Sequence, residues 1–469
     1  MRKVALLCYL ITCAVYSQNK QVLYGFSEIP QSLLLNPGAK VSNDWYFGIP
    51  LLSHIHVNAG ISGSTVYDIF ADNNTNFNVK LQDAIFAMDD NDFYTFNQQL
   101  DIFSGGFAFG NKRGKNQYLS FGLYQELDFI AYFPKDLAVL ALEGNQSNIN
   151  RVFKTDQINV SAEVVSVLHV GYNKKVSKYF TYGFRGKLYS NVFNVNSTKN
   201  DGYFITRTGD NNFYNHVFDL DLEVRTSGLA SLTDSDSDFE ARDITKRLLF
   251  GENMGLGIDA GFTYQFNDQW YLDASVLDLG FINHKKDVEN YSVKGAYAFE
   301  GINPLFPETG DRQTADEYWS ALEEDLEDLF TEDTTTTKFT TWRPTKINAS
   351  LNYAFGEKGN SYSCNCVKEE SVYLNRVGMQ LFIVNRPKLP KFALTAYYHR
   401  RLLKGLNVKA TYTIDAYSLN NIGFGMYTNL GGFNFYVMAD NFLQYKNIYD
   451  AQSVSLQLGF NYIFNKNED

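Results

Sequence analysis

Two histidines and two cysteines are the residues of this chain whose type and spacing could carry chemistry. His54 and His56 stand two apart in a run that alternates apolar and polar residues, so both lie on one face of a strand. That spacing can serve a metal, but no carboxylate or cysteine joins them locally, and we expect polar residues that face an interior instead. Cys364 and Cys366 form a possible disulfide, a local staple; the alternatives are a redox site, half of a metal site or two thiols in a turn.

A second possible metal site is an acidic loop. Asp234, Asp236 and Asp238 place carboxylates at every second position, as a calcium loop begins. A calcium loop of the EF-hand type then needs Gly at its sixth position and Glu at its twelfth, where this chain has Phe239 and Thr245. The sequence therefore favours ordinary loop acidity over a calcium site.

A possible partner contact lies in residues 314–330, which are predicted to form an acidic amphipathic helix. Thr314 and Glu317 suit a capping box at its start. Four apolar residues at helical spacing form a stripe: Tyr318, Leu322, Leu326 and Leu329. The stripe could contact another protein, and the alternative is packing on the chain's own barrel or loops.

Signatures of catalysis are missing from the sequence. It contains no phosphate-cradling glycine loop, no zinc spacing and no nucleophile elbow. The net charge of −11 speaks against a nucleic-acid partner, which requires a basic face. We therefore expect a protein that is not an enzyme, with no cofactor and no metal.

The elements that must position these residues are strands, and the last segment is the clearest. From Val454 to Phe464 apolar or aromatic residues alternate with small or polar ones, and Ile463 is the exception. A soluble sandwich and a membrane barrel both produce such alternation. The segment covers roughly ten residues, which is the span of a tilted strand across a bilayer.

The order of the connections supports a membrane barrel. Short connections are expected at 111–116, 173–178 and 267–268, and long ones near 62–99, 130–162, 191–254 and 281–343. Outer-membrane barrels have short periplasmic turns and long outer loops. With helices expected at 79–88 and 134–142, the sequence predicts an all-β fold: a transmembrane antiparallel β-barrel of about 14 strands over residues 45–469, with long loops that carry short helices.

Ionisable residues inside the expected strands indicate a polar lumen. Asp259, Asp273, Lys409 and Asp415 each lie on the polar face of an alternating run. A charge on the lipid face is costly, whereas a polar interior solvates it. We assign no catalytic role to these residues.

The N-terminus has the pattern of a secretory signal. Arg2 and Lys3 precede an apolar run from Val4 to Val15, and small residues near Ser17 suit a cleavage site. The sequence predicts a signal peptide over residues 1–17, a periplasmic N-terminal segment over 18–44 and a location in the outer membrane, in contact with its lipid. A short membrane anchor and a lipoprotein signal ending at Cys13 are the alternatives.

Residues 29–61 resemble the start of a Bacteroidota outer-membrane barrel family of mostly unassigned function. The resemblance is carried by Pro-Gln-Ser-Leu-Leu-Leu-Asn-Pro at 30–37, Tyr-Phe-Gly-Ile-Pro at 46–50 and Val-Asn-Ala-Gly at 57–60. The segment is also similar in style to fatty-acid-transporter-like barrels, whose mature start carries Asn-Pro-Ala. Gly38 replaces that Ala here, which weakens the link to the transporter branch.

Two functions follow from the resemblance. Some members of the family resemble the plug subunit of the type IX secretion translocon, which binds a large translocon barrel protein and closes its pore. The resemblance thus implies an accessory or plug subunit of a protein-export complex. The alternative is an outer-membrane transporter or channel for hydrophobic or small solutes.

Overall fold

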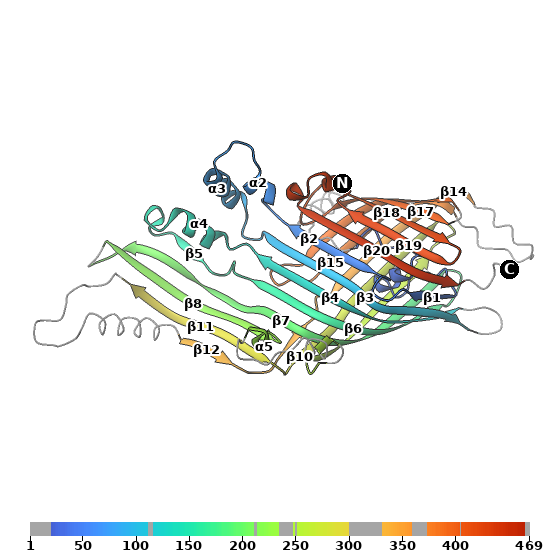
Figure 1. Ribbon diagram of the computed structural model, residues 1–469, viewed down its shortest axis with the longest axis horizontal. Coiled ribbons are helices and arrows are strands. Elements are labelled where there is room, and N and C mark those ends of the chain that lie inside the picture. The colour runs from blue at the N-terminus through green and yellow to red at the C-terminus, as the bar shows by residue number, and fades with distance from the viewer. Residues whose placement is uncertain are drawn as a thin grey trace, which may run out of the picture.

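The computed structural model describes residues 20–110, 116–210, 213–233, 247–248, 251–299, 331–358, 373–403 and 405–464. Within these residues 14 antiparallel strands form one closed barrel, whose first strand is interrupted into β1 and β2 near Pro50 (Figure 1). The barrel closes because β20 pairs with β19 on one side and with β1 and β2 on the other. The predicted fold class is confirmed. The barrel strands are β1 (Trp45–Gly48) with β2 (Ile55–Ile61), β3 (Phe93–Phe109), β4 (Gln117–Tyr132), β6 (Val160–Lys175), β7 (Phe180–Thr208), β9 (Met254–Gln265), β10 (Trp270–His284), β14 (Lys346–Lys358), β15 (Tyr373–Val384), β16 (Lys391–Leu403), β17 (Leu406–Ile414), β18 (Asn421–Leu430), β19 (Phe433–Asp440) and β20 (Ser453–Phe464).

The helices are short and lie in the connections or before the first strand. They are η1 (Pro30–Leu34), α2 (Val66–Phe70), α3 (Phe77–Ala87), α4 (Lys135–Glu143), η2 (Gln146–Asn148), α5 (Ala230–Thr233), η3 (Phe442–Lys446) and η4 (Ile448–Asp450). The helices predicted at 79–88 and 134–142 are confirmed as α3 and α4. Among the described helices, none combines the length and the apolar composition that crossing a membrane requires.

Three of the long connections contain strands that the sequence did not predict. β7 pairs with β9 up to Ser190 and then with β8 (Tyr214–Ser227), so it continues past the wall for a total of 29 residues. β11 (Val288–Phe299) and β12 (Thr331–Thr335) extend this sheet, while β5 (Val152–Lys154) pairs with β7 and β13 (Phe339–Trp342) with β10. These strands project beyond the barrel (Figure 1).

Burial along β20 reverses the order of a soluble sheet. Gln457 and Asn461 are fully buried, whereas Leu456 and Phe460 are exposed. An exposed apolar face around a closed wall with a polar interior is the arrangement that lipid requires. The chain is therefore an outer-membrane protein, as the sequence predicted. Ile463, the exception in the alternation, is buried in the interior in one cluster with Leu33.

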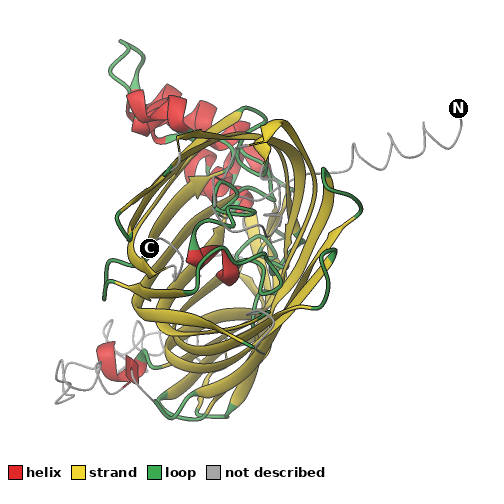
Figure 2. Ribbon diagram, turned by 90° about the vertical axis from the view of Figure 1, so that its right-hand side faces the viewer, coloured by secondary structure: helices red, strands yellow, loops and turns green. Residues whose placement is uncertain are grey.

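In the first half of the chain the short and long connections lie at opposite ends of the barrel. The turns after β3, β6 and β9 share one end with the start of β1 and the end of β20, since Trp45 pairs with Phe464. Figure 2 looks into the barrel from this end and shows a short helix and loops inside the ring of strands. By the rule of short periplasmic turns this end is periplasmic, and the long loops with α2, α3 and α4 are outside the cell.

The lipid-facing assignment predicts the cost of a charge on the outer wall. Leu351 lies midway along β14 and is 44% exposed, so Leu351→Arg should lower the free energy of unfolding by about 2–4 kcal/mol in a bilayer. Urea unfolding in lipid vesicles, followed by tryptophan fluorescence, measures the change. Phe213→Arg is the control, because Phe213 lies at the tip of the β7–β8 hairpin and is 89% exposed. Equal losses in both variants would contradict the lipid-facing assignment.

Candidate functional site

The lumen is filled by residues 20–44, which we call the plug segment. Most of its residues are buried, including Lys20 at its start and Asn43 near its end. Pro30 begins the 3-10 helix η1, and Asn36 accepts a hydrogen bond on Oδ1 from the N–H of Gly38 at 2.9 Å, which shapes the Asn-Pro-Gly turn. The sequence predicted a periplasmic segment over residues 18–44, and its described part enters the lumen from the periplasmic end.

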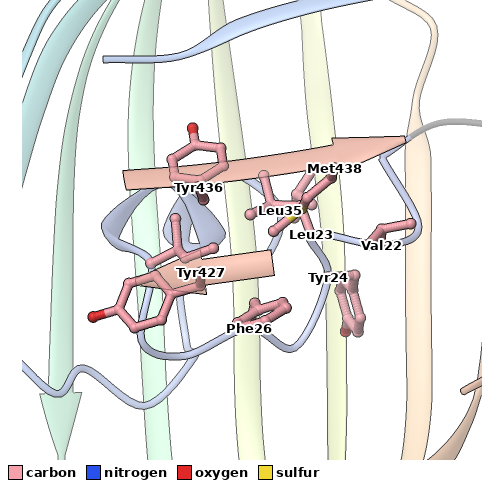
Figure 3. Close-up of a cluster of buried hydrophobic side chains, with 9 residues drawn as sticks. Val22, Leu23, Tyr24, Phe26, Leu35, Tyr427, Tyr436 and Met438 are labelled. Atoms are coloured by element: carbon pink, nitrogen blue, oxygen red, sulfur yellow. The ribbon is translucent and has the colours of Figure 1, made fainter. Parts of the chain in front are cut away.

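An apolar cluster joins the plug segment to one side of the wall (Figure 3). Tyr427 on β18 and Tyr436 and Met438 on β19 point into the lumen. The plug segment contributes the other members of the cluster: Val22, Leu23, Tyr24, Phe26, Ile29 and Leu35. Burial of this area removes apolar surface from water and gives the segment its main anchor.

Side chains of the wall satisfy the backbone of the plug segment. Arg185 donates to the carbonyls of Leu33 and Leu34 at 3.0 and 2.7 Å, and Lys409 donates to that of Tyr24 at 2.6 Å. Two more side chains donate in the same way: Ser275 to the carbonyl of Leu35, and Asn173 to the carbonyls of Pro37 and Ala39. An irregular loop inside a barrel needs such donors because its carbonyl groups have no strand partner.

The Asn-Pro-Gly turn lies against two glycines of the wall. Gly183 on β7 and Gly261 on β9 are directly paired across the two strands. A Cβ on Gly183 would lie 2.0 Å from the carbonyl oxygen of Pro37, and a Cβ on Gly261 would lie 2.1 Å from Oδ1 of Asn36. A Cβ on Gly38 would meet the carbonyl oxygen of Gly261 at 2.2 Å, so glycine rather than alanine fits here.

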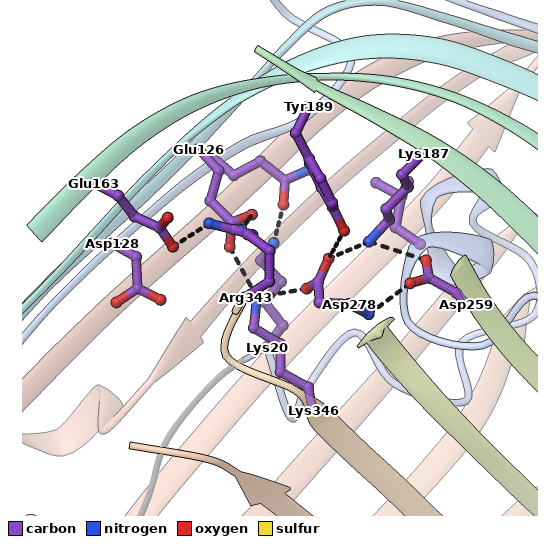
Figure 4. Close-up of polar contacts among 12 residues, drawn as sticks. Lys20, Glu126, Asp128, Glu163, Lys187, Tyr189, Asp259, Asp278, Arg343 and Lys346 are labelled. Atoms are coloured by element: carbon purple, nitrogen blue, oxygen red, sulfur yellow. Dashed lines mark hydrogen bonds and ion pairs between the residues drawn. The ribbon is translucent and has the colours of Figure 1, made fainter. Parts of the chain in front are cut away.

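Eight alternating charges cross the lumen on the other side of the plug segment, and we call them the ion chain (Figure 4). In order they are Arg185, Asp259, Lys187, Asp278, Lys346, Glu126, Arg343 and Glu163. Its separations include 3.0 Å from Lys187 Nζ to Asp259, 3.1 Å from Lys346 Nζ to Asp278 and 2.8 Å from Lys346 Nζ to Glu126. Because Asp259 and Asp278 come from β9 and β10 while Glu126 and Glu163 come from β4 and β6, the chain ties separate parts of the wall together.

Lys20 connects the plug segment to the ion chain. Its Nζ donates to Oε1 of Gln99, and it lies in the field of Glu126. Burial lowers the pKa of Lys20 to about 8, and the negative charge of Glu126 opposes that shift. The first described residue of the chain is therefore held among the charges near the middle of the lumen.

A β-bulge in β10 brings Asp278 into the ion chain. The pairing of β9 with β10 shifts register between Val276 and Leu279, and Asp278 takes a positive φ of 59°. Its N–H donates to Oδ1 of Asp259 at 2.7 Å instead of to a neighbouring strand. We did not identify Asp278, Arg343 or Lys346 from the sequence. The only signal in the sequence was that the alternation of apolar and polar residues along this strand breaks at residues 276–279.

The predicted inward-facing residues are confirmed. His54, His56 and Asn58 are buried in the lumen, and Nδ1 of His54 lies 2.7 Å from the hydroxyl of Tyr436. Asp259 takes part in the ion chain; the other three charged residues named from the sequence, Asp273, Lys409 and Asp415, are also buried. Among the described residues no group of three or more His, Cys, Asp or Glu side chains could hold a metal ion.

Three predicted features lie outside the described residues. They are the Cys364 and Cys366 pair, the acidic loop from Asp234 to Thr245, and the helical stripe of Tyr318, Leu322, Leu326 and Leu329. They remain predictions from the sequence.

A closed outer-membrane barrel that is plugged by its own N-terminal segment is the class of protein that this fold and site define. The chain belongs to DUF5723, a family of unknown function whose sequence profile matches residues 37–440. No protein of curated function matches it. Among solved structures it is similar to the toluene transporter TbuX of Ralstonia pickettii, with 8% identity, a TM-score of 0.44 and coverage of 96% of this chain and 97% of that one. A FadL homologue of Pseudomonas aeruginosa is similar at 9% identity and a TM-score of 0.42, with coverage of 96% and 100%.

The close contact of Gly183 and Gly261 with the Asn-Pro-Gly turn, which we call the glycine seat, predicts a way to loosen the plug segment. Gly183→Ala places a methyl group against the carbonyl of Pro37, and such overpacking costs about 1–3 kcal/mol. We expect the ion conductance of single barrels in planar bilayers to rise by about tenfold or more, as the closed state loses that free energy. Gly186→Ala is the control three residues along β7, where a Cβ would meet nothing within 4 Å. A rise of equal size in the control would contradict the proposed seat.

The ion chain predicts that replacing a buried lysine lowers the free energy of unfolding far more than replacing a half-exposed one. Lys187→Met leaves Asp259 and Asp278 buried with one cationic partner fewer, so the free energy of unfolding should fall by about 3–5 kcal/mol. Lys199→Met, which breaks a half-exposed pair with Asp221, should change it far less, because solvent screens that pair. Urea unfolding of both variants in the same detergent gives the comparison, and similar losses would contradict the ion chain.

Proposed function

We propose that this chain is an outer-membrane transporter for hydrophobic or small solutes, in which the plug segment closes the lumen until a solute displaces it. The observation that carries the proposal is the apolar cluster between the plug segment and β18 and β19. Tyr427, Tyr436 and Met438 face a lumen that is otherwise lined mainly by polar and charged residues. When the plug segment moves away, these side chains line an apolar recess, which suits an apolar solute better than an ion.

The anchors of the plug segment support a movable gate. Many of its polar contacts with the wall are hydrogen bonds from side chains such as Arg185, Lys409 and Ser275 to carbonyl groups. A hydrogen bond from a neutral side chain contributes about 0.5–1.5 kcal/mol net and one from a charged side chain about 1.5–3 kcal/mol, because water can replace either partner. The segment can therefore shift without the loss of any hydrogen bond between strands.

The ion chain supports a selective rather than a general pore. Its four acids and four bases are buried and satisfied by one another, so they offer no single sign of charge to a passing ion. A general porin keeps a water-filled interior. A lumen closed by paired charges and an apolar plug fits a solute that must break specific contacts to pass.

The closed lumen also favours a second function, an accessory or plug subunit of a type IX secretion translocon. A subunit that seals a larger pore must not itself leak, and a barrel filled by its own side chains meets that need. Its partner would be a large translocon barrel protein in the same membrane.

Uptake of a hydrophobic dye tests the transporter. The host is a Gram-negative cell whose outer membrane excludes N-phenyl-1-naphthylamine, a dye that fluoresces once it enters. In cells that produce the chain, dye fluorescence should increase faster than in cells with an empty vector. Met438→Gln makes the recess polar at constant length and should slow uptake several-fold. Met379→Gln is the control on the outer face of β15, where the side chain is 55% exposed.

The dye assay and purification from the native outer membrane together separate the two functions. If the dye enters no faster than with the empty vector, while the tagged chain purifies from its native outer membrane with a stoichiometric, much larger barrel protein, the accessory function replaces the transporter. If dye uptake rises and the chain purifies alone, the transporter stands.

A further inference from the structure

A cavity of about 70 Å³ separates part of the plug segment from the wall. Tyr24 and Lys40 of the plug segment line it on one side. Thr263 on β9, Tyr271 and Asp273 on β10, and Arg376 on β15 line it on the other. Lys40 is exposed at the periplasmic end, so the cavity lies where a solute that has passed the plug segment would leave.

Arg376 is the unusual residue of this cavity. Its Nη1 donates to the carbonyl of Gly25 at 2.9 Å, and its guanidinium carbon lies 5.4 Å from the centre of the Tyr271 ring. In the described part of the chain it forms no ion pair, although Asp273 and Glu28 act on it through space. Arg185 and Arg343, by contrast, are each paired with a carboxylate. A guanidinium has five N–H donors, and Arg376 leaves most of them unused.

Two phenol hydroxyls of the cavity can also donate to a bound acceptor. The hydroxyls of Tyr24 and Tyr271 find no hydrogen-bond partner among the described residues, and Tyr24 is only 1% exposed. The one carboxylate, Asp273, is already engaged: Thr263 donates to it at 2.5 Å and Asn352 at 3.0 Å. Buried polar groups without partners cost free energy, and an acceptor in the cavity would satisfy the unused N–H groups of Arg376 and both hydroxyls.

We propose that this cavity binds the carboxylate group of a small organic acid, which names a solute class for the transporter and rests on that proposed function. A carboxylate accepts two parallel hydrogen bonds from a guanidinium and further bonds from phenol hydroxyls. A cavity near 150 Å³ holds benzene, so about 70 Å³ holds a carboxylate group but not a whole aromatic acid. The rest of the acid extends toward Lys40 and the periplasm.

Calorimetric titration of the purified full chain in detergent tests the site, with benzoate as the probe and benzyl alcohol as its uncharged match. Arg376→Gln should weaken benzoate binding by about tenfold or more, the effect of losing a charge-assisted hydrogen bond, and leave the alcohol unaffected. Arg400→Gln is the control, because Arg400 is exposed on the outer face of β16 and faces Asn375 across the strand pair. Arg376→Lys should fall between the wild type and the glutamine variant.

Each other result has a defined meaning. Benzoate that binds Arg376→Gln as well as the wild type overturns the proposal, and so does a titration in which inorganic phosphate binds as tightly as benzoate. Folding of every variant is checked by heat-dependent migration in electrophoresis; if Arg376→Gln fails it, Tyr271→Phe, which should weaken benzoate several-fold, decides. If the wild type binds benzoate through Arg376 but no dye enters the cells, the site stands and the transporter is rejected. If dye enters but Arg376→Gln binds benzoate as tightly as the wild type, the transporter stands and the site is rejected.

Discussion

Everything inside this barrel depends on one constraint: polar groups that are kept from water must find partners. Closing 14 strands in lipid sends every second side chain inward, and in this chain those side chains are largely polar or charged. A water-filled lumen would solvate them. Here the plug segment removes much of that water, so the buried charges pair in the ion chain and the remaining donors bind the carbonyl groups of the plug.

The constraint makes wall and plug complementary in detail. Where the plug segment turns tightly at Asn-Pro-Gly, the wall has the paired glycines Gly183 and Gly261. Where the plug segment is apolar, the wall changes from polar residues to Tyr427, Tyr436 and Met438. Beside Arg376 the match is incomplete, and there a cavity with unused donors remains.

The sequence predicts the strands better than it predicts the contents of the lumen. Alternation along β20 and the order of short and long connections indicate the barrel, its strand number and its orientation, because these follow from local periodicity. The partners of Asn36 or Lys20 depend on which strands meet across the lumen, and no local pattern carries that information. Asp278 reaches the ion chain only through a bulge, which the sequence records as a small break in alternation. Ile463 was visible as an exception, but its reason, contact with the cluster around Leu33, was not.

The position of the plug segment has a consequence for the order of assembly. Gln31 exchanges hydrogen bonds with Asn461, 430 residues later, and Lys409 and Arg376 hold carbonyls within the first residues described. The plug segment therefore lacks these partners until the last strands are in the membrane, although its contacts with Asn173 and Arg185 need only earlier strands. Its seat is complete only when the last strands have joined, so sealing of the lumen reports that the whole barrel is complete.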